Sequence, residues 1–99
     1  VIGRTDDILV SDKGEQILPV AIRMLVKPFL VDDTNYQLLQ HSSNEFELKL
    51  VDINKQIIVR ELLKKIKLIL GYKARIQVNY TDTLLSDGGK IRNIRNMIK

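Results

Sequence analysis

Hydrophobic residues recur at the spacing of an α-helix in two stretches of the chain. The first stretch has apolar residues at offsets 0, 3, 4, 7, 8 and 11: Leu18, Ala21, Ile22, Leu25, Val26 and Phe29. The second has them at offsets 0, 3, 4, 7, 10 and 11: Val59, Leu62, Leu63, Ile66, Ile69 and Leu70. Pro19 suits the first turn of a helix, Pro28 disfavours its continuation, and Gly71 is a natural helix stop. The pattern therefore predicts two amphipathic helices.

Three strands are predicted around the second helix, and apolar and polar residues alternate in the second and third of them. These strands are Tyr36–His41, Glu45–Val51 and Ala74–Asn79. Only a short polar turn separates the first two, which favours an antiparallel hairpin. Two shorter β segments, Asp7–Ser11 and Glu15–Leu18, flank a tight turn in which Gly14 is free to adopt a positive φ.

The order β-β-α-β-β-α-β, followed by a basic tail, predicts an α+β domain. We expect one three-stranded sheet, mainly antiparallel, with both helices on one face and a small β-hairpin before it. Either Asp52 or Asn54 is expected to cap the second helix. In the tail, Ile91, Ile94 and Ile98 lie at helical offsets, and we expect this apolar side to pack on its own domain.

Length and composition narrow the class of protein. Ninety-nine residues fit one domain, and 44% hydrophobic with 28% charged residues exclude wholesale disorder. The absence of cysteine excludes disulfides and thiolate metal sites, and His41 alone cannot form an imidazole cluster, so we interpret it as structural or surface-exposed. Asp32 and Asp33 read as a turn rather than a metal site. The chain begins at Val1 and shows no self-sufficient catalytic set, so we expect a piece of a larger protein.

The net charge of +4 is divided unevenly along the chain. Residues 1–54 hold five Lys/Arg against nine Asp/Glu, whereas residues 55–99 hold eleven against three. A basic half leaves a nucleic-acid-binding module open as an alternative, with Tyr72 and Tyr80 as stacking groups. A protein-interaction domain using the tail is a third interpretation. Against nucleic acid, the strands lack an aromatic-rich signature, since only five aromatic residues exist.

Two polar segments fall outside the periodic patterns. The first, Gly3-Arg4-Thr5-Asp6-Asp7-Ile8-Leu9, lies at the start of the chain. The second, Leu84–Arg92, contains Gly88, Gly89 and Lys90. Two glycines let a backbone approach a ligand closely, and a lysine beside them offers a mobile positive charge for a phosphate. Alone, the Gly-Gly-Lys string lacks the spacing of a complete phosphate loop.

Taken in order, these segments resemble motifs of one family. The chain resembles the small C-terminal domain of adenylate-forming enzymes (the acyl-CoA synthetase, or AMP-binding, superfamily), nearest the phenylacetate–CoA ligase-like branch with its capsular-polysaccharide-biosynthesis relatives. The initial segment looks like the Gly-Arg-x-Asp-Asp hinge motif, and Gly89-Lys90 followed by Arg92 looks like the terminal Gly-Lys-x-Arg motif. Gly14, Pro19 and Ile22 match the glycine, proline and isoleucine that follow the hinge motif in this family. The resemblance covers essentially the whole chain.

The resemblance implies a role for each motif in an ATP-dependent ligase. Residues 1–7 would be a hinge at Asp6 and Asp7, and residues 81–92 a loop carrying the catalytic Lys90. Arg4 would contact the ribose or phosphate of ATP or AMP, and Gly88, Gly89 and Arg92 would also contribute to cofactor binding. The family forms an acyl-adenylate from a carboxylic acid and ATP, and many members then transfer the acyl group to CoA.

The same resemblance implies what surrounds the domain. It would be a rotating lid that is inactive alone and works with its own N-terminal adenylation domain, which would bind most of the Mg²⁺. The enzyme would be cytoplasmic. Arg23 stands where the family usually has a glutamate, and Leu85 and Ser86 replace a Pro and a basic residue. These departures leave the acceptor and the acyl substrate open.

Overall fold

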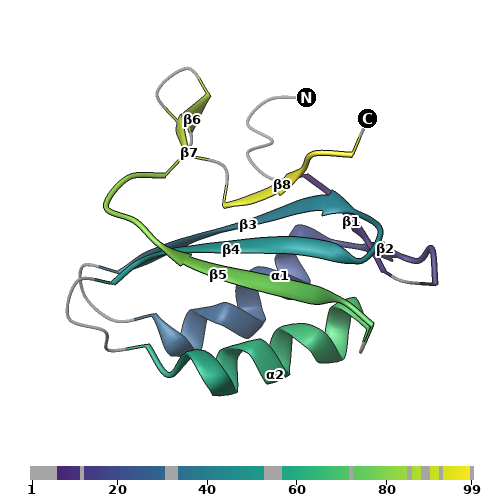
Figure 1. Cartoon of the computed structure of the whole chain (residues 1–99), viewed down its shortest axis with the longest axis horizontal. Coiled ribbons are helices and arrows are strands. Elements are labelled where there is room, and N and C mark those ends of the chain that lie inside the picture. Colours follow the sequence, from purple (N-terminus) through teal and green to yellow (C-terminus); the bar gives the residue numbers. More distant parts are fainter. Residues whose placement is uncertain are drawn as a thin grey trace.

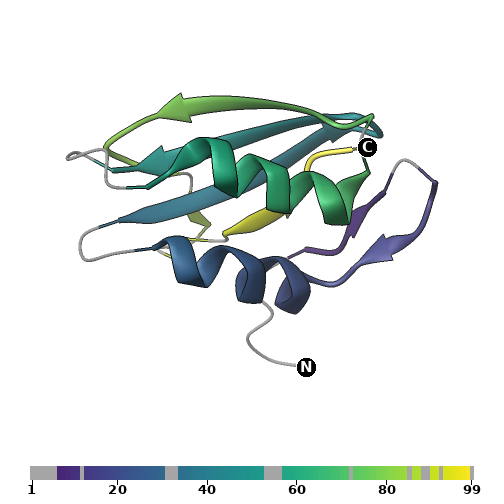
Figure 2. The same ribbon diagram turned by 90° about the horizontal axis from the view of Figure 1, so that it is seen from below.

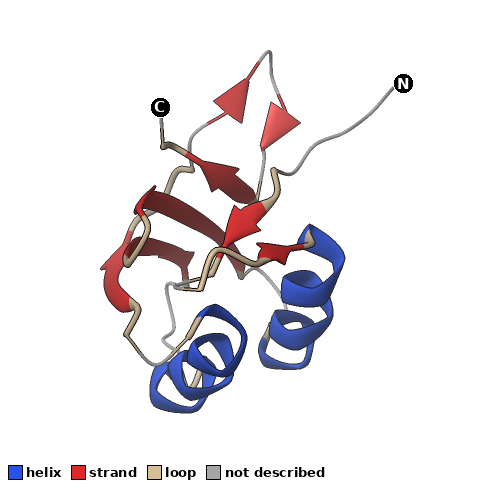
Figure 3. Cartoon of the chain, turned by 90° about the vertical axis from the view of Figure 1, so that its right-hand side faces the viewer, coloured by secondary structure: helices blue, strands red, loops and turns tan. Residues whose placement is uncertain are grey.

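The computed structural model describes residues 7–11, 13–30, 34–52, 57–71, 73–84, 86–87, 90–91 and 93–98. A four-stranded sheet forms one layer, and two helices that lie side by side form the other (Figure 1, Figure 2). The predicted α+β class and the placement of both helices on one face are confirmed (Figure 3). The strands are β1 (Leu9–Val10), β2 (Gln16–Ile17), β3 (Asn35–Ser42), β4 (Glu45–Val51), β5 (Arg75–Tyr80), β6 (Ser86–Asp87), β7 (Lys90–Ile91) and β8 (Ile94–Asn96). The helices are α1 (Pro19–Val26), the short 3₁₀ helix η1 (Lys27–Phe29) and α2 (Val59–Leu70).

The main sheet has the strand order β5-β4-β3-β8. The three predicted strands share it, and β3 and β4 form the expected antiparallel hairpin, with Leu38 opposite Leu48. Two details of the prediction are wrong. The sheet gains a fourth strand from the tail, and β5 and β8 run parallel to their neighbours β4 and β3, so the sheet is mixed rather than mainly antiparallel. The parallel β4–β5 pair follows from α2, because a helical crossover returns the chain to the same end of the sheet.

Helix α1 begins at Pro19 as predicted, and Pro28 lies in η1, which follows it directly. Helix α2 ends before Gly71, whose φ of 107° is available to glycine at little cost. The expected cap is wrong in detail, because α2 has no side-chain hydrogen bond at its N-cap, Ile58. Instead, the buried carboxylate of Asp52 accepts a hydrogen bond from the backbone N–H of Ile57, 2.8 Å away, just before the helix. Among the described residues, no helix has the length and apolarity needed to cross a membrane.

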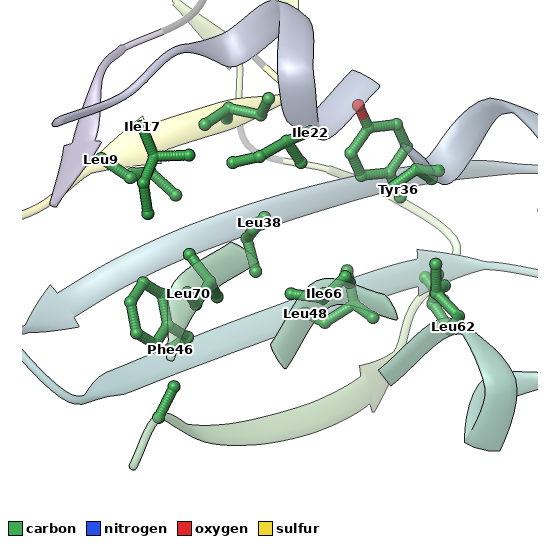
Figure 4. Close-up of a cluster of buried hydrophobic side chains, with 14 of the residues drawn as sticks. Leu9, Ile17, Ile22, Tyr36, Leu38, Phe46, Leu48, Leu62, Ile66 and Leu70 are labelled. Carbon is green, nitrogen blue, oxygen red and sulfur yellow. The ribbon is translucent and has the colours of Figure 1, made fainter. Parts of the chain in front are cut away.

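The core lies between the sheet and the helices (Figure 4). Leu38 and Leu48, which are cross-strand partners, point from the sheet toward Leu62 and Ile66 of α2, and all four are buried. Ile22 and Val26 close the core from α1. The tail contributes Ile94, which is fully buried on strand β8, so the expectation that the tail packs on its own domain is confirmed for this residue. It is wrong for Ile98, which is 44% exposed, and the tail packs as a strand and not with helical spacing.

Candidate functional site

Lys90 lies on a short β-hairpin that leaves the main sheet. Strand β6 pairs with β7 in antiparallel register, with Asp87 opposite Lys90 and Ser86 opposite Ile91. This hairpin lies above the sheet in Figure 1, away from the helices. Lys90 was predicted within a turn-rich loop, and the chain there is more regular than the turn signals suggested.

The chain that follows this hairpin is anchored on the sheet by Asn93. Its side-chain Nδ2 donates to the backbone oxygen of Tyr36 at 2.6 Å and to Oδ1 of Asn35 at 3.0 Å. Its backbone oxygen accepts a hydrogen bond from the N–H of Leu38 at 2.7 Å. Three hydrogen bonds thus hold Asn93 to the beginning of β3, three residues after Lys90.

The chain that precedes the hairpin is anchored close by. The backbone N–H of Thr81, directly after β5, donates to the oxygen of Leu50 at 2.8 Å. The hydroxyl of Thr81 also forms a local turn with Thr83, donating to its oxygen at 2.8 Å and accepting from its N–H at 3.2 Å. Leu50 is the cross-strand partner of Tyr36. Both ends of the segment that carries Lys90 are therefore fixed to the same pair of sheet residues.

Asp7, a predicted hinge residue, lies against the strand that follows the hairpin. Its backbone N–H donates to the oxygen of Ile94 at 2.8 Å, and its Oδ2 accepts from the N–H of Asn96 at 3.1 Å. The side chain of Asn96 adds a bond to the oxygen of Ile8 at 3.1 Å. The structure thus brings the last residue of the predicted hinge segment next to β8.

A buried amide extends this anchoring along the N-terminal segment. Gln40 is fully buried on β3, and its side chain pairs with the backbone of Val10 in both directions. Oε1 accepts from the Val10 N–H at 3.0 Å, and Nε2 donates to the Val10 oxygen at 2.8 Å. This pairing joins β1 to the main sheet.

The remaining predicted residues lie outside the part of the chain that the structure describes. They are the site residues Arg4, Asp6, Gly88, Gly89 and Arg92, together with Asp32, Asp33, Asn54 and Tyr72. Their expected roles stay predictions. Sequence reasoning missed the anchoring residues Asn93, Asn96 and Gln40. Only Gln40 gave a signal, as a polar residue in register with the apolar Tyr36 and Leu38 on the core side of β3.

The sheet face opposite the helices carries a polar cluster around Glu47. Its carboxylate contacts Nε2 of His41 at 3.0 Å and accepts from Nδ2 of Asn79 at 2.7 Å. Partial burial alone would raise the pKa of Glu47, but the hydrogen bonds from His41 and Asn79, helped by the charge of Lys49, lower this pKa below its ordinary value. His41 itself is a surface residue, with its side chain 47% exposed, and it contacts Glu47 as a structural partner.

A hollow of about 350 Å³ adjoins this cluster, lined by His41, Glu45, Phe46, Glu47, Arg75, Ile76 and Gln77. Its polar side chains carry charges of both signs. Within the described ranges, no group of three or more His, Asp or Glu side chains is placed to hold a metal ion. The hollow lies on β4 and β5 next to the end of β3, and its lining includes none of the motif residues.

Comparison with known proteins supports the fold class. No protein-family model and no curated protein sequence matches this chain. Among solved structures, the chain is similar to a crystallised domain of phenylacetate-coenzyme A ligase from Bacteroides vulgatus ATCC 8482, with a TM-score of 0.54 and 18% sequence identity. The superposition covers 98% of each chain. The chain therefore shares the fold of that domain over nearly its whole length, as the resemblance predicted.

Proposed function

We propose that this chain is the mobile C-terminal domain of an ATP-dependent carboxylate-activating ligase and that it supplies the adenylation lysine, Lys90. The observation that supports this proposal most is the hairpin itself. In a chain with the fold of a phenylacetate-coenzyme A ligase domain, Lys90 lies on a projecting hairpin within a segment whose ends, Thr81 and Asn93, are bonded to one rung of the sheet. A cation held in this way is suited to enter a site on another domain.

The proposed reaction joins a carboxylic acid to ATP, forming an acyl-adenylate and releasing pyrophosphate. A second step transfers the acyl group to the thiol of CoA and releases AMP. Lys90 would neutralise negative charge between the carboxylate and the α-phosphate, and this charge grows in the transition state. Removing one such preorganised donor typically costs about 3–4 kcal/mol, or about 10²–10³ in rate.

The other motif residues have supporting roles in this proposal. Arg4 contacts the ribose or phosphate of the nucleotide, Gly88 and Gly89 let the backbone approach it, and Arg92 adds positive charge. Asp6 and Asp7 form the hinge about which the domain turns. The N-terminal adenylation domain holds Mg²⁺ and the acyl pocket, so the chain is inactive alone and its partner is the rest of a cytoplasmic enzyme.

The test uses the full-length parent protein, which this proposal requires to contain a larger upstream domain. A panel of carboxylic acids that begins with phenylacetate is screened for ATP-dependent release of pyrophosphate. Lys90→Ala should lower the rate by about 10²–10³ at saturating ATP. Lys64→Ala is the matched control, because Lys64 is an exposed lysine on α2, away from the hairpin. Unchanged pyrophosphate release by Lys90→Ala would refute the role of Lys90.

A further inference from the structure

Asn93 is the first described residue after the hairpin, and both donors of its side-chain amide bind the sheet. A side-chain amide nitrogen carries two N–H groups, and the Nδ2 of Asn93 has two acceptors, the oxygen of Tyr36 at 2.6 Å and Oδ1 of Asn35 at 3.0 Å. Asn35 Oδ1 also accepts from the backbone N–H of Tyr36 at 2.8 Å. These hydrogen bonds therefore hold the side chains of Asn35 and Asn93 together at the first two residues of β3.

The position of these hydrogen bonds matters because Asn93 follows Lys90 by only three positions in the sequence. Three residues of fully extended chain span at most about 10–11 Å. On the other side, Thr81 is fixed to Leu50, the cross-strand partner of Tyr36. Because Asn93 follows Lys90 by only three positions, fixing Asn93 also restricts where the backbone of Lys90 can lie.

We propose that Asn93 is a positioning residue for Lys90, acting through the hairpin and not through contact with substrate. This inference rests on the proposed function of Lys90. A loss of the two side-chain bonds leaves Asn93 held by its backbone bond to Leu38, so the direction in which the chain leaves β7 is less restricted. Because misplacement of a catalytic group by about 1 Å is able to cost about 10²-fold in rate, a small loss of order at this position affects turnover strongly.

The test is a double-mutant cycle on pyrophosphate release by the parent enzyme. Asn93→Ala alone should lower kcat by about 10–100-fold, with the KM for ATP and for the acid changed less than about three-fold. In the Lys90→Ala background, Asn93→Ala should cause no further loss, because Asn93 acts only through the lysine. An equal loss from Asn93→Ala in both backgrounds, or no loss in either, would overturn the proposal.

Ser11→Ala is the matched control for stability. The hydroxyl of Ser11 also accepts two hydrogen bonds, from the N–H groups of Lys13 at 3.2 Å and Glu15 at 3.1 Å, but it lies in the β1–β2 hairpin. Ser11→Ala should lower the melting temperature by about as much as Asn93→Ala does, and it should leave kcat unchanged. If Asn93→Ala does not fold, Asn93→Ser, which retains one donor, replaces it in the same cycle.

The outcomes separate this inference from the function on which it rests. If Lys90→Ala releases pyrophosphate at the wild-type rate, the proposed function is wrong and the positioning role fails with it. If Lys90→Ala is inactive while the folded Asn93 variant keeps the wild-type kcat, only the positioning role is wrong.

Discussion

The replacement Gln40→Glu tests how strongly the N-terminal segment is held to the sheet. Gln40 is fully buried, and its side chain binds both backbone polar groups of Val10 at 3.0 and 2.8 Å. Glutamate has nearly the same shape, so the change keeps the acceptor for the Val10 N–H. It replaces the donor by an oxygen, and an ionised carboxylate would then face the Val10 oxygen without a proton between them.

The cost follows from the burial and the geometry. One hydrogen bond is lost, and a charge without an opposite partner is placed where solvent does not reach, so we expect a loss of about 3–4 kcal/mol at pH 7. A chain of this size has a total stability of about 5–15 kcal/mol. When the carboxyl of the variant is protonated, its O–H is able to donate to the Val10 oxygen. The folded state therefore binds this proton more tightly than the unfolded state.

The sign of the pH dependence follows directly. A raised pKa in the folded state means that the stability of the variant relative to wild type increases as the pH falls. A penalty of about 3 kcal/mol corresponds to a pKa about 2 units above the ordinary value of about 4.3, since one unit is about 1.4 kcal/mol. The penalty should therefore shrink between about pH 6.5 and pH 4.5.

The measurement is urea denaturation of this chain at pH 7 and pH 4.5. Gln16→Glu is the control, because Gln16 is exposed on β2, lies opposite the apolar Val10 and should tolerate the charge. Subtracting the wild-type curve at each pH removes contributions from other titrating groups. A penalty below about 0.5 kcal/mol at pH 7, or one that does not change with pH, would show that the Gln40–Val10 pairing does not hold the segment.

Two further changes test the polar face and the basic helix. Because the pKa of Glu47 is lowered, its ionised form stabilises the folded state above the ordinary value of 4.5, and this contribution is lost as the pH falls below it. Glu47→Gln should therefore cost about 1 kcal/mol at pH 6 and progressively less toward pH 3 in urea titrations, and an unchanged difference would count against the His41 contact. Replacing Lys64, Lys65 and Lys67 by Gln should leave pyrophosphate release by the parent enzyme within about two-fold, since α2 lies away from the hairpin in Figure 1. If these replacements instead abolish a salt-sensitive binding of the chain to RNA, the nucleic-acid alternative gains support.

Periodicity predicted the elements that are long enough to show a period. The stripe from Val59 to Leu70 and the alternation from Glu45 to Val51 match α2 and β4 at both ends. Strand β8 was missed because three residues contain no clear alternation, and Ile91, Ile94 and Ile98 fitted a helical spacing equally well. Strand β8 exists because it pairs with β3, where Leu38 lies opposite Ile94. A pattern within a few neighbouring residues cannot predict a contact between residues so far apart in the sequence.

For the candidate site, too, local sequence strings and distant contacts carry different information. The motif order predicted site roles for Lys90 and Asp7 from short strings of residues, and these roles stay predictions. The hydrogen bonds that place them join residues that are far apart in the sequence, such as Asn93 with Tyr36 and Asn96 with Asp7. An exposed asparagine and a structural one look alike in a single sequence, so these anchors became visible only in the folded chain.

The anchors have a consequence for how the proposed hinge would move the lysine. Asp7 is bonded to Ile94, and Asn93, the residue before it, is bonded to β3. Ile94, the partner of Asp7, is only four positions after Lys90, a reach of at most about 14 Å, so the chain has little slack between hinge and lysine. Under the proposed function, rotation about Asp6 and Asp7 would therefore carry Lys90 with the sheet as one unit. A lysine on a freely moving loop would lose much of such a rotation, because the loop itself would absorb it.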